Sequence, residues 1–154
     1  MLKLSLICLF MFSACSTPRY FSDEEISRLQ NKRYEKIPYE KIFSSMRTVL
    51  ESEGYSIKNS DLKGGYIMAT MDGNDELSKI NSQVSSFLNA GKNYPTSRIY
   101  EVSVNVEQSG EVVETKATLN KIEEYSMGGS RSEVVLDTGF YKEFYEKVQK
   151  SFAL

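Results

Sequence analysis

Residues 98–107 read RIYEVSVNVE, and from Tyr100 to Val106 every second side chain is apolar. A period of two predicts a strand with one face against a core and one face in solvent. Ser109 and Gly110 then provide a tight turn, and residues 112–125 (VVETKATLNKIEEY) continue in an extended pattern. The two segments predict a long antiparallel hairpin at the centre of a sheet.

An amphipathic helix is expected before this hairpin, between Pro38 and Gly54. Proline suits the first turn of a helix, where a missing N–H costs nothing, and glycine favours the C-terminal stop. Apolar side chains recur between them at helical spacing: Tyr39, Ile42, Phe43, Met46, Val49 and Leu50. The pattern predicts one main wall of the core.

A second hairpin is expected directly after this helix. Residues 55–59 and 65–71 alternate apolar with polar side chains on either side of a turn at 61–65 (DLKGG). Residues 74–90 follow with a narrow apolar stripe, which predicts a helix that depends on docking because serine and asparagine lower its intrinsic helicity.

The C-terminal part predicts a short extended piece at 133–136 and a last helix capped by Thr138. One line of the last helix is apolar and aromatic: Phe140, Phe144, Val148 and Phe152, flanked by Tyr141 and Tyr145. Such a stripe is more typical of a core than of a ligand site.

Together these segments predict an α+β domain over residues 37–154. We expect an antiparallel sheet of four to five strands with two or three helices packed on one face, in the order α-β-β-α-β-β-α. A single domain agrees with a chain of 154 residues that is 40% hydrophobic and 26% charged.

Residues 1–14 predict a signal peptide. Lys3 supplies a positive charge, residues 4–12 (LSLICLFMF) are apolar, and the small residues Ser13 and Ala14 follow. A helix over residues 4–14 would span about 16 Å, against a hydrocarbon core of about 30 Å. The stretch is therefore too short for a permanent membrane span.

Residues 12–15 (FSAC) resemble the lipobox of bacterial lipoproteins, with Phe12 where leucine is usual. The resemblance implies that the Cys15 thiol receives a diacylglycerol and that the leader is cleaved just before it. The alternative is an ordinary secretory signal followed by a free cysteine. Cleavage would leave 140 of the 154 residues with Cys15 as the only cysteine, so no disulfide could form within the domain.

Residues 15–36 are polar and mixed in charge, and we expect them to form a lipidated tether. Ser22 and Glu25 have the spacing of a capping box, so a short helix is an alternative for part of this stretch. Ser16 follows the cysteine, and in lipoproteins of Gram-negative enterobacteria an aspartate there signals inner-membrane retention. By that resemblance the protein would lie in the outer membrane, facing the periplasm.

A second resemblance covers residues 39–57 and 61–69, where a helix leads into a Gly-aromatic strand, a turn and a second strand. This arrangement looks like a repeating unit of several envelope lipoproteins. They include the C-terminal domains of BamC-type accessory lipoproteins of the outer-membrane β-barrel assembly machinery and small bacterial envelope lipoproteins, which the closing segment 140–145 (FYKEFY) fits better. The resemblance implies a BamC-like or helix-grip fold and contains no catalytic residue.

Histidine is absent, which excludes Ser-His-Asp and Cys-His catalysis and imidazole metal ligands. Residues 72–76 (DGNDE) carry alternating oxygen ligands, but Leu77 and Gln83 stand where an EF-hand needs glycine and glutamate, so a turn before a helix is expected. With a formal charge of −2, the chain offers no argument for nucleic acid. We expect no catalytic residue, cofactor or metal.

One basic stretch near the tether could face anionic head groups. It interleaves basic and aromatic residues, diluted by Glu35 and Glu40, so a solvated face is the preferred interpretation: Lys32, Arg33, Tyr34, Lys36, Tyr39 and Lys41.

The sequence thus predicts a non-enzymatic lipoprotein, bound to the membrane through acyl chains on Cys15, that acts as an interaction or structural module of the cell envelope. Another envelope protein would contact the exposed sheet face or a mobile loop at 128–131. The alternative is a carrier of a small apolar ligand in a cavity between the last helix and the sheet.

Overall fold

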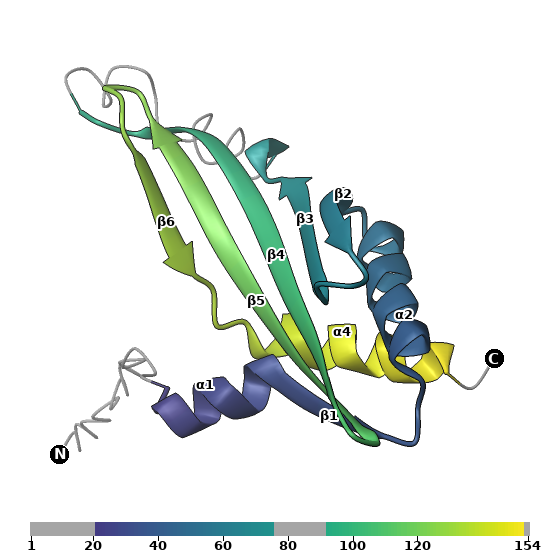
Figure 1. The fold of residues 1–154 in the computed structure, drawn as a ribbon. Coiled ribbons are helices and arrows are strands. Elements are labelled where there is room, and N and C mark those ends of the chain that lie inside the picture. The colour runs from purple at the N-terminus through teal and green to yellow at the C-terminus, as the bar shows by residue number, and fades with distance from the viewer. Residues whose placement is uncertain (1–20, 76–91, 153–154) are drawn as a thin grey trace, which may run out of the picture.

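The structure is a computed structural model that describes residues 21–75 and 92–152. Within them, three helices accompany an antiparallel sheet of six strands (Figure 1). The elements are α1 (Asp23–Gln30), β1 (Asn31–Glu35), α2 (Tyr39–Ser52), β2 (Ser56–Asp61), β3 (Tyr66–Asp72), β4 (Pro95–Ser109), β5 (Val112–Tyr125), β6 (Ser130–Val134) and α4 (Thr138–Ser151). The sheet order is β1-β5-β4-β3-β2, and β6 also pairs with β5.

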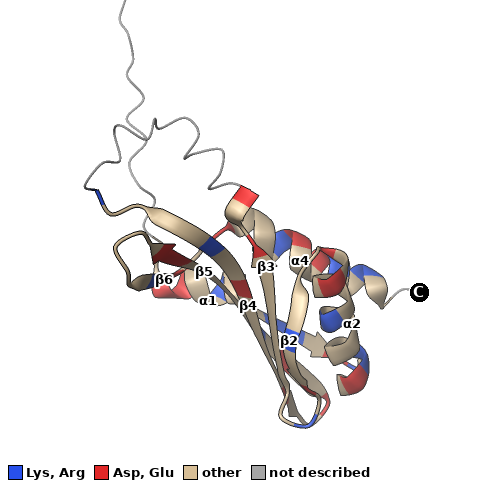
Figure 2. Ribbon diagram, turned by 90° about the horizontal axis from the view of Figure 1, so that it is seen from above, with Lys and Arg blue, Asp and Glu red and all other residues tan. Residues whose placement is uncertain are grey.

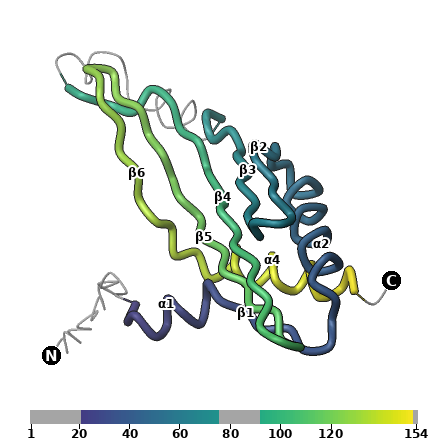
Figure 3. The backbone as a smooth tube through the Cα atoms, viewed as in Figure 1, coloured from purple at the N-terminus to yellow at the C-terminus, as the bar shows by residue number. Residues whose placement is uncertain are grey.

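The predicted fold class is confirmed, and the predicted central hairpin is present as β4 and β5. These strands stay in register from Ser109 opposite Val112 to Arg98 opposite Glu123. The turn places Gly110 at φ +62°, a left-handed conformation that glycine adopts without strain. β4 and β5 run on beyond the helices together with β6, as the tube in Figure 3 shows.

Residues 23–35 correct the expected boundary of the tether, because they belong to the folded domain. Ser22 caps α1 by accepting the N–H of Glu25, whose carboxylate accepts the N–H of Ser22 at 2.9 Å. β1 then pairs with β5 and buries Tyr34 to 4% exposure. β1 takes the strand count past four to five, and its single buried apolar residue explains why hydrophobic periodicity did not reveal it.

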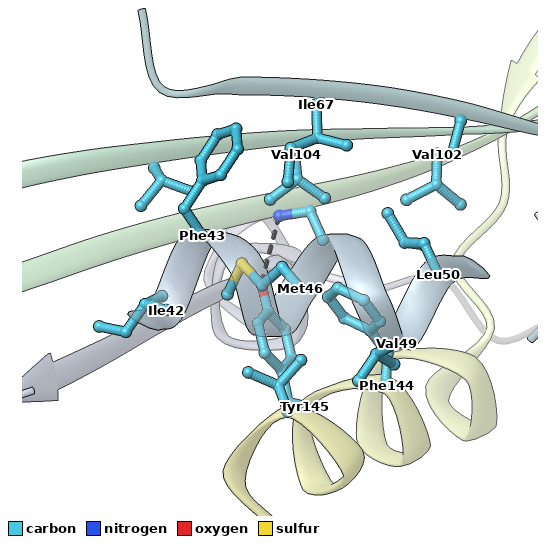
Figure 4. Packing of buried hydrophobic residues seen from close by; sticks show 14 of the residues in the cluster. Ile42, Phe43, Met46, Val49, Leu50, Ile67, Val102, Val104, Phe144 and Tyr145 are labelled. Atoms are coloured by element: carbon cyan, nitrogen blue, oxygen red, sulfur yellow. Dashed lines mark hydrogen bonds between the residues drawn. The ribbon is translucent and has the colours of Figure 1, made fainter. Parts of the chain in front are cut away.

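The core lies between the sheet and helices α2 and α4. Ile42, Met46 and Leu50 on α2 are fully buried. Leu50 points toward Val102 on the sheet (Figure 4). Full burial of such a side chain contributes about 1.5–3 kcal/mol each. This confirms the apolar line predicted after Pro38, although Pro38 itself is the cap residue before the first turn.

Helix α4 supplies the aromatic side of the core, as its sequence predicts. Tyr141, Phe144, Tyr145 and Val148 are buried. The predicted cap is one residue off: Asp137 caps the helix by accepting the N–H of Gly139 at 2.8 Å, because its carboxylate reaches the free backbone donors of the first turn.

Two strands share one edge of β5. β1 pairs with residues 112–116 and β6 with residues 120–124. In the gap between them, the hydroxyl of Tyr145 accepts the N–H of Ala117 at 3.2 Å and donates to the carbonyl of Gln30 at 2.5 Å. The hydroxyl of Tyr141 accepts the N–H of Leu119 at 3.0 Å. α4 therefore closes an edge that neither strand covers.

Of the helix predicted over residues 74–90, only Asn74 and Asp75 are described, and both are helical. The signal peptide and Cys15 likewise lie outside the described residues. In the parts that are described, no helix is both long and apolar enough to cross a membrane.

Candidate interaction surfaces

We call the part of β4, β5 and β6 that extends past α2 and α4 the projecting end; it comprises residues 95–99, 120–125 and 130–134 (Figures 1 and 3). Its two faces differ. The face that continues the core side is charged, and the opposite face, which continues the helix-free side of the sheet, carries three apolar side chains.

A partly buried ion pair occupies the charged face. The Nε and Nη2 atoms of Arg98 lie 2.9 and 2.7 Å from one carboxylate oxygen of Glu123, and Tyr125 donates to the other at 3.2 Å. The side chains of Arg98 and Glu123 are only 13% and 10% exposed. Burial alone would raise the pKa of Glu123, but the Arg98 hydrogen bond and the Lys121 charge outweigh it, so the pKa is lowered.

The charged face continues onto β6. Lys121 Nζ lies 2.5 Å from the carboxylate of Glu133, and Arg131 lies 3.2 Å from its other oxygen. The hydrogen bond from Lys121 is the main reason that the pKa of Glu133 is lowered. Opposite charges therefore alternate both along β6 and across to β5. In Figure 2, acidic and basic segments both lie at β6.

The helix-free face of the sheet is mostly polar. Ser103 stands opposite Thr118, and Glu101 opposite Asn120. On the projecting end, Ile99 and Ile122 form a cross-strand apolar pair, and Ile99 is 37% exposed. Val134 on β6, 52% exposed, adds a third apolar side chain to this face.

An open hollow of about 680 Å³ lies at the other end of the sheet, between the start of α2, the β2–β3 turn and the β4–β5 hairpin. Tyr39 crosses it and donates to the carbonyl of Leu62 at 2.7 Å. Burial, followed by the charge of Asp61, raises the pKa of Tyr39. The Tyr39 hydroxyl already bonds to the β2–β3 turn. We therefore interpret this hollow as a space beside the turn and not as a binding site.

A smaller hollow of about 160 Å³ lies between α4, the end of α2 and β3, where Phe140, Phe144 and Tyr55 line it. Pockets that enclose small ligands usually measure about 300–1,000 Å³. The aromatic side chains instead pack on each other: the rings of Phe140 and Phe144 are stacked with centroids 5.9 Å apart.

Side chains of the basic stretch near the tether make separate contacts within the domain. Arg33 pairs with Glu114 at 3.1 Å, Tyr34 is buried in the core, and Lys41 donates to the carbonyl of Phe152. Arg33 therefore faces the helix-free side of the sheet, whereas Tyr34 faces the core on the helix side.

The acidic segment at 72–76 forms a turn as far as it is described. Asp72 accepts the N–H of Asn74, and the side chain of Asn74 accepts the N–H of Arg98, each at 2.8 Å. Among residues 21–75 and 92–152, no group of three or more acidic or cysteine side chains could hold a metal ion.

The sequence reasoning missed the charge network of the projecting end. Arg98 and Glu123 occupy inward positions of their strands, in phase with Val102 and Leu119. Their inward position in the alternation was the sequence signal for this network, since a charge on the inward face requires a partner. A scan of the chain matches no protein-family model, and a search among curated proteins returns no significant similarity.

Proposed function

We propose that the protein is a membrane-anchored bacterial lipoprotein whose domain is a non-catalytic interaction or structural module of the cell envelope. The observation that supports the module is the difference between the two faces of the sheet. On the helix side of the sheet the aromatic side chains are buried in the core, and on the other side the surface is mostly polar, with Ile99, Ile122 and Val134 at one end. Protein interfaces typically combine apolar side chains with a polar rim, so this surface suits a protein contact.

The domain begins close to Cys15 in the sequence, which limits the length of the tether between the anchor and the domain. α1 begins at Asp23, so only residues 16–22 separate the domain from Cys15. Seven extended residues span at most about 25 Å. A lipidated Cys15 would therefore hold the domain close to the bilayer, with its contact surfaces restricted to partners near that membrane.

The small hollow beside α4 supports the module over the carrier of an apolar ligand. Its volume is about 160 Å³, and the aromatic residues that a carrier would need as lining are packed within the core. Enlarging it would require the removal of ring contacts such as Phe140 on Phe144.

Metabolic labelling with an acyl-chain probe tests the anchor. Cys15→Ala should lose both the label and membrane retention, because two or three acyl chains make release negligible. Cys8→Ala is the matched control and should keep both, since Cys8 lies within the leader. Label that persists in Cys15→Ala would place the lipid elsewhere and contradict the proposal.

Site-specific photo-crosslinking in cells tests the module. A photoreactive residue at Thr118, in the middle of the helix-free face, should yield a discrete adduct of defined mass. The control position is Ser44, which is exposed on α2. The same adducts of abundant neighbours at both positions would contradict a dedicated contact surface.

A further inference from the structure

The outer edge of β6 has backbone groups available for another strand. Gly129 accepts the N–H of Tyr125, and Val135 donates to the carbonyl of Leu119, so odd-numbered residues face β5. Because successive residues of a strand direct their N–H and C=O groups to opposite sides, those of Ser130, Ser132 and Val134 face outward. Within the described chain, β6 pairs only with β5.

This edge is accessible and carries no proline. Ser130, Arg131 and Ser132 are exposed, and Val134 is 52% exposed. Proteins usually protect such an edge with proline, a bulge, charged side chains or a covering segment, and of these the described chain gives β6 only charged side chains, Arg131 and Glu133. The edge therefore meets the backbone requirement for adding a strand.

We propose that two copies of the chain pair through β6, antiparallel and centred on Ser132, into one continuous sheet. In this register Ser132 meets the partner's Ser132, and Ser130 meets the partner's Val134. The outward groups of the three residues in each copy supply the N–H and C=O partners for the other. The contact is its own complement, as a twofold interface requires.

Charge complementarity selects a second copy as the occupant. Centring on Ser132 places Arg131 opposite the partner's Glu133, and Glu133 opposite the partner's Arg131. Arg131 already lies beside Glu123 in the register of β5, so a row of alternating charge would run from Arg98 and Glu123 through Arg131 to the partner's Glu133. An extended segment of an unrelated protein would match the backbone groups but not this order of charges.

Side-chain proximity favours these ion pairs. Arg131 and the partner's Glu133 would form a non-hydrogen-bonded pair, in which Cα atoms are about 4.5 Å apart and side chains are closest. Arg131 is 68% exposed and so retains the freedom to reach across. Pairing shifted by two residues would lose this match and place like charges opposite each other.

Cysteine crosslinking tests the pairing in the full chain, purified in mild detergent with Cys8→Ser and Cys15→Ser so that the introduced thiol is the only one. Cα atoms of a hydrogen-bonded antiparallel pair lie about 5.5 Å apart, within disulfide range. Ser132→Cys should form a disulfide-linked species of twice the 17.6 kDa chain mass several-fold faster than Ser109→Cys. Ser109 is an exposed strand residue at the opposite hairpin. Equal rates would overturn the proposal.

A charge reversal tests the self-complementarity. In the Ser132→Cys background, Arg131→Glu should slow crosslinking several-fold because two carboxylates would then oppose each other, and salt should narrow the difference. Arg47→Glu makes the same charge change on the exposed side of α2 and should leave the rate unchanged. Circular dichroism verifies that each variant keeps the fold. Equal rates for Arg131→Glu and Arg47→Glu in folded proteins would overturn the assigned register.

The pairing does not depend on the lipid anchor. The crosslinking chain lacks Cys15, so its failure would leave the labelling result for Cys15 untouched, and loss of the anchor would leave the crosslink intact. An adduct with another protein at Ser132, without the homodimer, would assign the edge to a different occupant and refute self-pairing.

Discussion

The hydroxyl of Tyr145 lies 3.2 Å from the backbone nitrogen of Ala117 and accepts its hydrogen bond. The same oxygen donates to the carbonyl of Gln30, the residue that leads into β1. A side chain of α4 thereby does what a neighbouring strand would do at this point of β5. Burial raises the pKa of Tyr145 to about 12 and outweighs the hydrogen bond from Ala117, which lowers the pKa because it stabilises the phenolate.

Tyr145→Phe should lower the free energy of unfolding by about 1–3 kcal/mol. The substitution keeps the ring but leaves the N–H of Ala117 and the C=O of Gln30 without this partner in a buried place. Urea unfolding of the full chain measures the change. Tyr66→Phe on the helix-free face is the control and should change the stability by less than about 0.5 kcal/mol.

Tyr34→Phe should have the opposite sign. Within the described chain, the Tyr34 hydroxyl is buried without a hydrogen-bond partner, and burial raises its pKa. Its ring contact with Phe152, at a centroid distance of 5.4 Å, does not need the oxygen. Removing the hydroxyl should raise the free energy of unfolding by about 1 kcal/mol, in the same urea experiment. A loss of stability equal to that of Tyr145→Phe would reveal an important bond at Tyr34.

These two tyrosines also mark how far the sequence reasoning could reach. Periodicity placed Tyr145 on the last helix beside an apolar line, and burial there is confirmed. It could not indicate that the hydroxyl bonds to β5, because the contact joins residues 28 positions apart. β1 was not predicted for a similar reason. It forms a strand because it pairs with the distant β5, and within β1 only Tyr34 is a buried apolar residue.

Gly65→Ala should be more destabilising than Gly54→Ala, although both glycines have positive φ. A Cβ at Gly65 would meet the carbonyl oxygen of Val106, at a distance of 2.1 Å, whereas a Cβ at Gly54 would meet open space. Gly54→Ala should therefore cost only the backbone strain, about 1–2 kcal/mol. Gly65→Ala adds about 1–3 kcal/mol for displacing β4. Thermal unfolding of the two variants checks the order, and equal losses would contradict the close approach.

The projecting end was only partly foreseeable. Alternation in 98–107 and 112–125 predicted both long strands and hence which residues share a face. The phase of Arg98 and Glu123 indicates that each charge faces inward and needs a partner, but a single sequence does not show that the two residues meet. Which backbone groups of β6 face outward depends on the register between β5 and β6, and local sequence patterns do not specify that register.

Glu123→Gln should destabilise the protein by about 2 kcal/mol at pH 7 and by progressively less in acid. The pKa of Glu123 is lower in the folded protein than the ordinary value of about 4.3 expected after unfolding. The carboxylate therefore contributes stability above about pH 4, and this contribution is lost as the pH falls through the folded pKa, where the unfolded chain binds more protons.

Urea unfolding at pH 7 and pH 3 measures the difference between wild type and Glu123→Gln at each pH. Glu133 keeps its own lowered pKa in the variant, so some acid sensitivity should remain. Glu124→Gln provides the matched control, because Glu124 is exposed on the helix-free side. Its effect should stay below about 0.5 kcal/mol at both pH values. A Glu123→Gln effect that is the same at both would mean that the Arg98 contact does not depend on the carboxylate charge.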